Sequence, residues 1–352
     1  MEAAKDTSGH EAAGPAMEVL ETSLDLTYSW SYRETRQLLR DLYTKARRAQ
    51  WVPEEVLDFS VDVDLDKPMM PDAMHPLWGS EIHARLTEAE LRQLNAEMAS
   101  WTLSQFLHGE QGALLAAAQL VASVPDLDSK LYGATQVVDE ARHVDVYNRY
   151  LHDKIGFSYP VNPHLKKLLD LILADARWDM KFLGMQIMVE GLALSAFAMM
   201  RQNSYEPLLR EITRYVMGDE ARHVAYGVLS LRDYYADQPE AVVREREDFV
   251  YEAAVLMRDR FLMQEVWVKM GLPLERCMEL ALHNQGQILF RQWLFSKIVP
   301  AVKKIGLLSP RQRERFQALG ILQYEDAEDP ILALERSEAE ARGERAAAAA
   351  AR

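Results

Sequence analysis

The sequence predicts an all-α protein, a four-helix bundle with additional helices at its N- and C-terminal sides. Three observations predict this class. Long amphipathic stretches are separated by proline or glycine, runs of β-branched residues are few, and no Asn-Gly hairpin turn occurs. The four stretches between residues 87 and 237 are long and joined by short connections, which is typical of an antiparallel bundle.

Capping and helix-breaking residues set the expected boundaries of each element. A first helix is expected at about 32–50, followed by an irregular segment that contains Pro68, Pro71 and Pro76. The first bundle helix starts at Thr87 and ends before Pro125, and Asp126 or Asp128 caps the second. The expected bundle helices are 87–123, 126–155, 163–202 and 205–237, and further helices are expected at 240–270, 274–304 and 310–320.

The chain is expected to hold one folded domain. Residues 1–20 are small and polar and are expected to be disordered, and residues 326–352 form a charged, alanine-rich tail. The single helical domain then covers 21–325, with the bundle at 87–237.

Composition excludes several classes of partner. The 40 basic and 54 acidic residues give a net charge of −14, and no basic stripe occurs, so neither nucleic acid nor an anionic membrane surface is an expected partner. Cys277 is the only cysteine, so the chain cannot build an iron–sulfur site of its own. Without a signal peptide or an uninterrupted apolar span, the cytoplasm is the expected location.

An internal repeat carries the functional prediction. The pentapeptide Asp-Glu-Ala-Arg-His occurs twice, at 139–143 and 219–223, 80 residues apart. A further glutamate lies 30 residues before the glutamate of each copy, at Glu110 and Glu190. The repeat therefore duplicates residues that can carry chemistry.

Helix geometry predicts that these residues lie at one level of the bundle. Glu110 lies 15 residues before Pro125, roughly 22 Å from the turn, and Glu140 lies 12 residues after Asp128, roughly 18 Å along the next helix. The corresponding residues of the second half also match in depth. Glutamate and histidine three residues apart share a helical face. We therefore expect six side chains to converge, namely Glu110, Glu140, His143, Glu190, Glu220 and His223.

Four buried carboxylates require cations to neutralise them. One glutamate from each of two helices and a Glu-x-x-His from each of the other two is the arrangement of di-iron and di-manganese carboxylate bundles. This donor set suits iron or manganese better than zinc. The expected cofactor is two iron ions, or one iron and one manganese. Asp139 and Asp219 are expected to accept hydrogen bonds from the ligating imidazoles.

Each of these residues taken singly also has a less specific interpretation. A single Glu-x-x-His on a helix is commonly a surface pair, and a lone buried glutamate can simply be a satisfied polar residue. However, His143 and His223 occur in identical motifs, and Glu190 interrupts a strongly apolar stretch. The combination favours a dinuclear site.

These motifs resemble the ferritin-like di-iron carboxylate superfamily, in its ribonucleotide-reductase-like and oxygenase branch, over about residues 40–235. The doubled motif is similar to the hydroxylase subunits of bacterial multicomponent monooxygenases. Residues 50–55, Gln-Trp-Val-Pro-Glu-Glu, are similar to ribonucleotide reductase small subunits. The resemblance implies an oxidase or oxygenase that uses dioxygen on a small organic substrate and receives electrons from a reductase or a ferredoxin-type donor. A homodimer is also expected.

The chain departs from each subfamily at a defined position. Leu194 stands where the multicomponent hydroxylases place a threonine, four residues after the third glutamate. Val216 stands where the arylamine N-oxygenases add a third histidine, four residues before the last glutamate. The sequence after Tyr324 contains no further aromatic residue, unlike the docking tail of a reductase small subunit. The reaction itself therefore stays open.

Further residues are candidates for the site. Tyr147, four residues after His143, is at the position of the radical tyrosine in reductase small subunits, but it could equally be a core aromatic. Apolar residues on the same helical faces are expected either to line a substrate pocket or to be core: Phe106, Ala113, Leu114, Ala193, Leu194, Phe197 and Val216.

The sequence leaves two other functions open. A radical-generating subunit would require a larger partner enzyme and a redox-active Tyr147. Iron storage would require a small bundle that assembles into a shell, and the roughly 115 residues after Asp237 would hinder that packing.

Overall fold

The computed structural model describes residues 17–33, 35–328, 331–332, 334 and 336. The described residues form helices and no strands, so the predicted all-α class is confirmed. The expected disorder of residues 1–16 and the expected structure of the tail beyond residue 336 lie outside the described residues.

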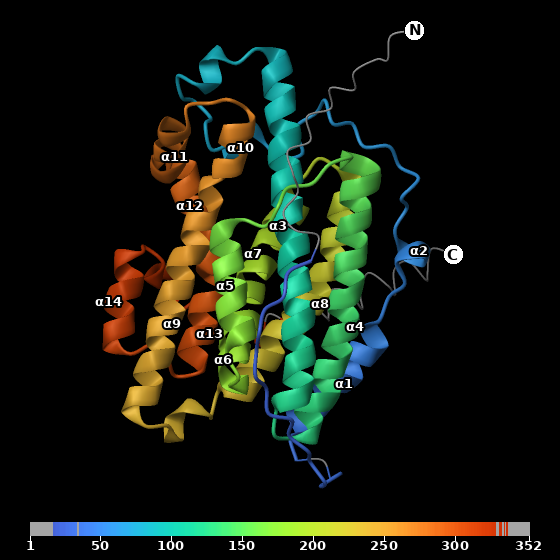
Figure 1. Ribbon diagram of the computed structural model, residues 1–352, viewed down its shortest axis with the longest axis vertical. Coiled ribbons are helices and arrows are strands. Elements are labelled where there is room, and N and C mark those ends of the chain that lie inside the picture. The colour runs from blue at the N-terminus through green and yellow to red at the C-terminus, as the bar shows by residue number, and fades with distance from the viewer. Residues whose placement is uncertain (1–16, 34, 329–330, 333, 335, 337–352) are drawn as a thin grey trace.

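The four-helix bundle is built from two long hairpins (Figure 1). Helix α3 (Glu88–Ser123) packs along α4 (Leu127–Tyr150), and α7 (Glu190–Asn203) packs along α8 (Pro207–Leu231). A π-helical turn, η3 (Leu151–Ile155), extends α4. Helix α6 (Trp178–Phe182) and the π-helix η4 (Leu183–Val189) precede α7.

Local capping explains the starts of these helices. The Thr87 hydroxyl accepts a hydrogen bond from the backbone N–H of Glu90, while the Glu90 carboxylate accepts one from the backbone N–H of Thr87. This reciprocal pair satisfies two donors that the helix leaves free. Asp126 caps α4 through the N–H of Ser129, and Glu206 caps α8 ahead of Pro207. Asp126 rather than Asp128 is thus the cap.

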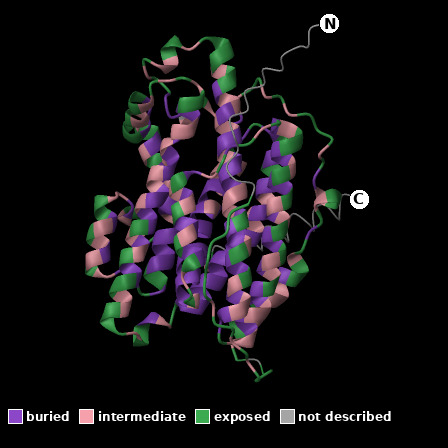
Figure 2. Ribbon diagram, in the orientation of Figure 1, coloured by how far each residue is buried: buried purple, intermediate pink, exposed green. Residues whose placement is uncertain are grey.

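Other helices surround the bundle. Helix α1 (Gln37–Ala49) lies against α4 and α8, and α5 (Pro163–Ala174) lies against α3 and α9 (Glu240–Asp259). Figure 2 shows that the buried residues concentrate in the central helices and that the outer helices bury one face. The surrounding elements are α1 (Gln37–Ala49), α2 (Pro53–Val56), η1 (Asp72–Met74), η2 (His83–Arg85), α5 (Pro163–Ala174), η5 (Tyr235–Asp237), α9 (Glu240–Asp259), η6 (Arg260–Leu262), α10 (Gln264–Lys269), α11 (Leu274–His283), α12 (Gln285–Trp293), η7 (Leu294–Ser296), α13 (Ile298–Lys304), α14 (Pro310–Ala318) and η8 (Leu322–Tyr324).

The predicted continuous helix at 163–202 is wrong. It breaks after Ala174 and resumes at Trp178. The Asp175 carboxylate accepts hydrogen bonds from the backbone N–H of Arg177 at 2.9 Å and from its guanidinium at 2.7 Å. A short acidic side chain that bonds to the backbone two residues on competes with the helix. The chain therefore turns without proline or glycine, and α5 lies outside the bundle.

The predicted helices at 240–270 and 274–304 are also interrupted. Met263 adopts a left-handed backbone with φ of 54°, which ends η6 and separates α9 from α10. Asn284 leaves the helical path and caps α12 through the N–H of Gln287. The predicted helix at 310–320 is observed as α14.

The helix from Trp178 to Asn203 is long and apolar enough to cross a membrane by composition, with a mean hydropathy of 1.6. However, 83% of that window is buried within the protein. It is therefore the central helix of a protein core, which explains an apolar stretch with Glu190 inside it.

Candidate metal centre

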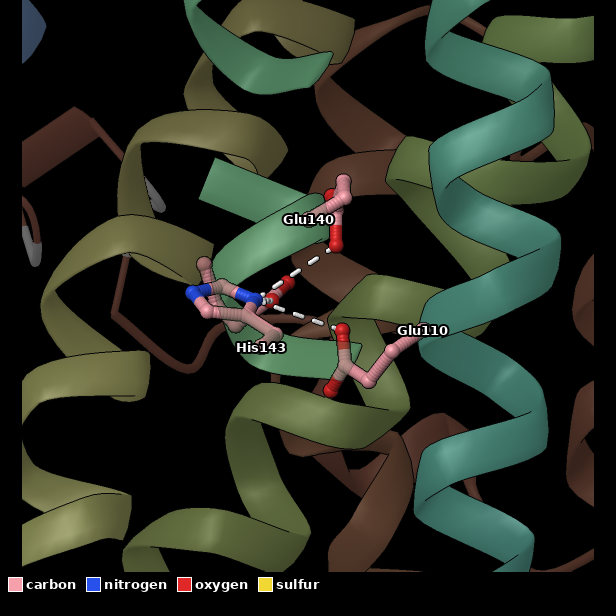
Figure 3. A group of neighbouring side chains, drawn as sticks. Glu110, Glu140 and His143 are labelled. Atoms are coloured by element: carbon pink, nitrogen blue, oxygen red, sulfur yellow. Dashed lines mark hydrogen bonds and ion pairs between the residues drawn. The ribbon is translucent and has the colours of Figure 1, made fainter. Parts of the chain in front are cut away.

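Six acidic and imidazole side chains meet inside the bundle, as the repeat predicted. They come from all four helices: Glu110 on α3, Glu140 and His143 on α4, Glu190 on α7, and Glu220 and His223 on α8. All are buried, the most exposed being Glu110 at 5%. Figure 3 shows Glu110 reaching from α3 towards His143 and Glu140 on the neighbouring helix.

The six residues form two groups that share Glu140. One oxygen or nitrogen from each of Glu110, Glu140, His143 and Glu220 lies within 4.8 Å of the others, and the same holds for Glu140, Glu190 and His223.

Two carboxylates lie between the two imidazoles. His143 Nδ1 is 3.4 Å from Glu140 Oε2 and 3.2 Å from Glu220 Oε1. His223 Nδ1 is 3.1 Å from Glu140 Oε1 and 3.5 Å from Glu220 Oε2. Each of these carboxylates thus presents one oxygen to each imidazole, the placement that a bridging carboxylate requires.

The cluster contains buried polar atoms without hydrogen-bond partners. Among the described residues, Oε2 of Glu140, Glu190 and Glu220 and Nδ1 of His223 are all of this kind. The His223 nitrogen is close to Glu140 but not in hydrogen-bonding geometry. Buried atoms of this type are costly when unsatisfied. Because they all face the same small region and are all good ligands for a hard cation, the donor set fits a pair of metal ions.

The electrostatics of the cluster point the same way. Burial and the neighbouring Glu220 carboxylate raise the pKa of Glu110 well above its usual range. Burial also raises the pKa of Glu190, and it outweighs the opposing effect of His223. Burial opposes charge on His143, but the surrounding carboxylates, Asp219 first, raise its pKa well above the usual value. The cluster thus favours positive charge among its carboxylates, which protons or metal ions can supply.

The outer nitrogen of each imidazole meets an aspartate from the other copy of the repeat. His143 Nε2 lies 3.1 Å from Asp219 Oδ2, and His223 Nε2 lies 3.3 Å from Asp139 Oδ2. A carboxylate in this position fixes the ring orientation and leaves Nδ1 free for the centre. The pairing crosses between the two halves because α4 and α8 face each other.

These aspartates are held in a buried ionic network. Arg142 donates to Asp139 at 2.6 Å and to Asp219 at 3.0 Å, and Arg222 also pairs with Asp219. Trp51 donates its indole N–H to Asp219 at 2.8 Å. A continuous contact path therefore runs from Trp51 through Asp219 to His143.

Gln136 and Gln186 form an amide pair on the opposite side of the cluster. Gln136 Nε2 donates to Glu140 at 3.0 Å and to Glu190 at 2.7 Å. Gln186 lies in the π-helix η4. Its side-chain Nε2 donates to the side-chain Oε1 of Gln136 at 3.3 Å. This segment directly precedes Glu190, and π-helical turns occur frequently at functional sites.

Tyr147 is buried in an aromatic layer beside the cluster. Its hydroxyl has no hydrogen-bond partner within the described part of the chain, and burial raises its pKa well above the usual value. Its ring centroid lies 6.1 Å from that of Phe106 and 5.9 Å from that of Phe197. The environment holds the phenol protonated, and a redox role for Tyr147 stays a prediction.

An apolar cavity of about 150 Å³ has Phe106, a residue of this aromatic layer, in its wall. Of the predicted pocket residues, Phe106 lines it. The other six, all within the described part of the chain, are not in its wall. Ala113, Leu194, Phe197 and Val216 are buried in the main core, Ala193 packs against that core, and Leu114 is half-buried.

Sequence reasoning missed three contributors to the site. Gln136 lies four residues before Glu140 on the same helical face, so its spacing could have revealed it. Gln186 has the same spacing relative to Glu190, so the same pattern could have revealed it. Trp51 reaches the cluster only through tertiary packing, and no periodicity in the sequence marks it.

Comparison with known proteins gives one extensive match. The family model described as p-aminobenzoate N-oxygenase AurF matches residues 32–306, more than three quarters of the chain and all six clustered residues. No curated protein sequence matches significantly.

Solved structures show a more distant similarity. An R2-like ligand-binding oxidase with an aerobically reconstituted Mn/Fe cofactor is 20% identical, with a TM-score of 0.46, over 76% of this chain and 93% of that one. A mutant of that oxidase with an anaerobically reconstituted Mn/Fe cofactor is 21% identical, with a TM-score of 0.47, over the same shares. Similarity at this level fixes neither a metal nor a substrate.

Proposed function

The chain belongs to the p-aminobenzoate N-oxygenase AurF family, and we propose that it uses two iron ions and dioxygen to oxidise the nitrogen of a small arylamine. Membership of this family makes the protein an oxygen-dependent oxidoreductase and favours an oxygenase over a radical-generating subunit or an iron store. The observation that carries the proposal is the buried cluster of four carboxylates and two imidazoles inside the matched region.

We assign the six residues to the metal pair as follows. Glu110 and His143 would hold one ion, Glu190 and His223 the other, and Glu140 and Glu220 would bridge them. The bound pair would supply the Lewis acidity and the electrons needed to reduce dioxygen. The family's arylamine N-oxygenases add a histidine where this chain has Val216, so six protein ligands rather than seven are proposed here.

The protein residues have separate tasks in this proposal. Asp219 and Asp139 orient the imidazoles, and Gln136 holds the two carboxylates that flank it. The aromatic layer around Tyr147 keeps bulk water away from the cluster. Val216, fully buried, adds to that dry environment.

The overall reaction needs electrons from outside the chain. Oxidation of an amine to a hydroxylamine consumes one dioxygen, two electrons and two protons, and releases one water. Since Cys277 is the chain's one cysteine, we propose a reductase or a ferredoxin-type protein as donor. A homodimer in the cytoplasm is also proposed, on the resemblance to the superfamily.

Metal analysis followed by turnover tests this function. The full-length protein loaded anaerobically with ferrous iron should hold two ions per chain. With a chemical reductant, an arylamine and ¹⁸O₂, it should form a product carrying labelled oxygen on nitrogen, detected by mass spectrometry. The variant Glu140→Ala should lose both properties, whereas Glu211→Ala, on the exposed face of α8, should keep them. A protein that binds no iron would contradict the proposal.

A further inference from the structure

Four large apolar side chains stand at alternate positions of the segment before α1. They are between 70% and 75% exposed, and they are Leu26, Tyr28, Trp30 and Tyr32. The residues between them are a threonine and two serines. The rings of Tyr28 and Trp30 stack with their centroids 5.1 Å apart, so they lie on the same side of the chain. An extended chain places every second side chain on one side. Segment 26–32 therefore turns an apolar, aromatic side to solvent.

Hydrogen bonds to the bundle hold this segment in place. The backbone N–H of Thr27 donates to the carbonyl of Ala122, near the end of α3, at 3.0 Å. Thr35 and Arg36 each donate their backbone N–H to the Asp128 carboxylate at 2.9 Å. Figure 1 shows the dark blue segment at the lower end of the bundle, where α3 and α4 are joined. The apolar side chains are therefore presented from a defined place on the protein.

The charges of the chain decide what can cover this apolar side. Exposed apolar surface of this kind marks an interaction site. Residues 17–33 carry three acidic side chains and one basic side chain, so an anionic lipid surface is an unfavourable partner. The whole chain has a net charge of −14, so two copies repel each other unless they meet at an uncharged surface. Segment 26–32 contains no charged residue, and it therefore allows a second copy to approach.

The segment is complementary to itself in the antiparallel direction. If Ser29 of one copy faces Ser29 of another, Tyr28 lies opposite Trp30 and Leu26 lies opposite Tyr32. Each of these pairs occurs twice, as a two-fold interface requires. Aromatic pairs across neighbouring strands are stabilising, and the leucine–tyrosine pairs bury further apolar surface. Among the described residues, none accepts the backbone N–H of Tyr28 or Trp30, so both donors are available to the other copy.

The two ends of the segment carry opposite charges in the same register. Asp25 precedes it and Arg33 follows it, so the antiparallel arrangement places Asp25 of one copy opposite Arg33 of the other. Both side chains are exposed, and neither forms an ion pair with a described residue. A parallel arrangement would bring like charges together, which is unfavourable. The charges therefore select the antiparallel direction.

We propose that residues 25–33 form a two-fold, antiparallel interface with the same residues of a second copy of this chain. This inference names the surface of a homodimer and does not rest on the oxygenase function. The segment contacts α3 and α4 near their connecting turn, so each copy keeps its own carboxylate–histidine cluster. An interface of about nine residues a side is small, because stable interfaces use about 20–30. The dimer should therefore dissociate on dilution.

Sedimentation velocity of the full-length protein tests the interface. The unaltered protein should show a monomer–dimer equilibrium that shifts with concentration. Trp30→Glu places a carboxylate opposite Tyr28 in both pairs and should weaken dimerisation at least about tenfold. Tyr205→Glu is the matched control, because Tyr205 is also aromatic and 64% exposed but lies just before α8, outside the segment. A protein that is monomeric at every concentration, or a dimer that is equally stable in Trp30→Glu, would overturn the proposal.

Exchanging the two charges tests the register. Asp25→Lys places a second cation opposite Arg33, and Arg33→Glu places a second anion opposite Asp25. Each single variant should weaken dimerisation about two- to tenfold. The double variant Asp25→Lys/Arg33→Glu restores opposite charges and should dimerise like the unaltered protein. Single variants that dimerise normally, or a double variant no better than the single ones, would show that these residues do not face each other, and the proposal would be wrong.

The remaining outcomes are distinguishable. Circular dichroism should show unaltered helix content in every variant, because the substituted side chains lie outside the core. If the unaltered protein stays monomeric and co-sediments with vesicles of phosphatidylcholine and phosphatidylglycerol, a lipid surface covers the segment and the proposal fails. A protein that binds no iron yet dimerises through this segment would refute the oxygenase function alone. One that oxidises an arylamine as a monomer would refute the interface alone.

Discussion

Gln136 is a neutral residue that contacts two carboxylates at once. Its amide donates to Glu140 and Glu190, and it is fully buried. Mutation of groups that orient metal ligands typically lowers metal affinity about 10-fold to 100-fold. Gln136, on α4, therefore holds the carboxylate of Glu190, the first residue of α7, by a hydrogen bond.

Replacing Gln136 with leucine should weaken iron binding about 10-fold to 100-fold, because both carboxylates lose the donor that holds them. Competitive titration against a chelator measures the change. The variant Gln136→Glu is a stricter test, since it keeps the shape and adds a fifth carboxylate. If Gln136→Leu binds iron as tightly as the unaltered protein, the amide has no positioning role.

Lys181 is a buried cation whose hydrogen-bond partners are neutral groups. It is fully buried and donates to Gln119 at 2.6 Å and to the backbone carbonyls of Ile172 and Leu173 at 3.3 Å. Burial lowers its pKa from 10.5 to about 8. Between pH 8 and pH 10.5, Lys181 therefore binds a proton more strongly in the unfolded chain than in the folded one.

The stability contributed by neutral Lys181 should be present above pH 10.5 and be lost as the pH falls through 8. Compared with Lys181→Met, the unaltered protein should therefore gain free energy of unfolding as the pH rises from 8 to 10.5. Urea unfolding of both proteins across this range measures the difference. If the free energies of unfolding of the two proteins change with pH in the same way, Lys181 titrates normally.

At the scale of elements, the π-helix η4 packs closely on α8. A Cβ atom on Gly227 would lie 2.7 Å from Gln186 Cβ and 3.2 Å from Ile187 Cδ1. The absence of a side chain at Gly227 lets η4 approach, which brings Gln186 to the amide pair and sets the position of Glu190.

Gly227→Ala should cost about 1–3 kcal/mol of stability, the usual cost of overpacking. Gly218→Ala on the same helix is the control: nothing lies within 4 Å of its added Cβ, so it should gain about 0.5–1 kcal/mol. Urea unfolding of the metal-free proteins measures both. Iron affinity should also fall in Gly227→Ala, whereas equal stabilities of the two variants would mean that η4 can move without cost.

At the scale of the whole molecule, the proposed metal pair joins the four bundle helices. Each helix contributes at least one residue to the cluster, so a bound pair would link both hairpins. In its absence, burial disfavours charge on Glu110 and Glu190. Stability and metal content should therefore be coupled.

Loading with iron should raise the midpoint of thermal unfolding, because each ion present at a hundredfold excess over its dissociation constant adds about 2.7 kcal/mol. Calorimetry with and without a chelator measures this. Glu190→Gln provides the contrast: it should be less stable than the unaltered protein with iron, but about as stable without it, because burial raises the pKa of Glu190 and favours its uncharged form when no metal is bound. A variant equally destabilised in both states would show that Glu190 is structural.

Regular spacing let the sequence determine the bundle and its cluster. A fixed 1.5 Å rise converts the positions of Glu110, Glu140, Glu190 and Glu220 into depths, and the identical pentapeptides place each histidine beside its glutamate. The structure brings these six residues together as the spacing predicted. Local patterns suffice for such residues because helices are rigid and straight over this length.

Only the tertiary structure decided the features made by segments that meet across helices. The break at Asp175 depends on a side chain that bonds to its own backbone, and the crossed pairing of His143 with Asp219 depends on how α4 faces α8. The cavity combines His75, Phe106 and Asp72 with residues from α7 and α12. Such contacts carry no periodicity, because packing between distant segments is set by shape rather than by sequence spacing.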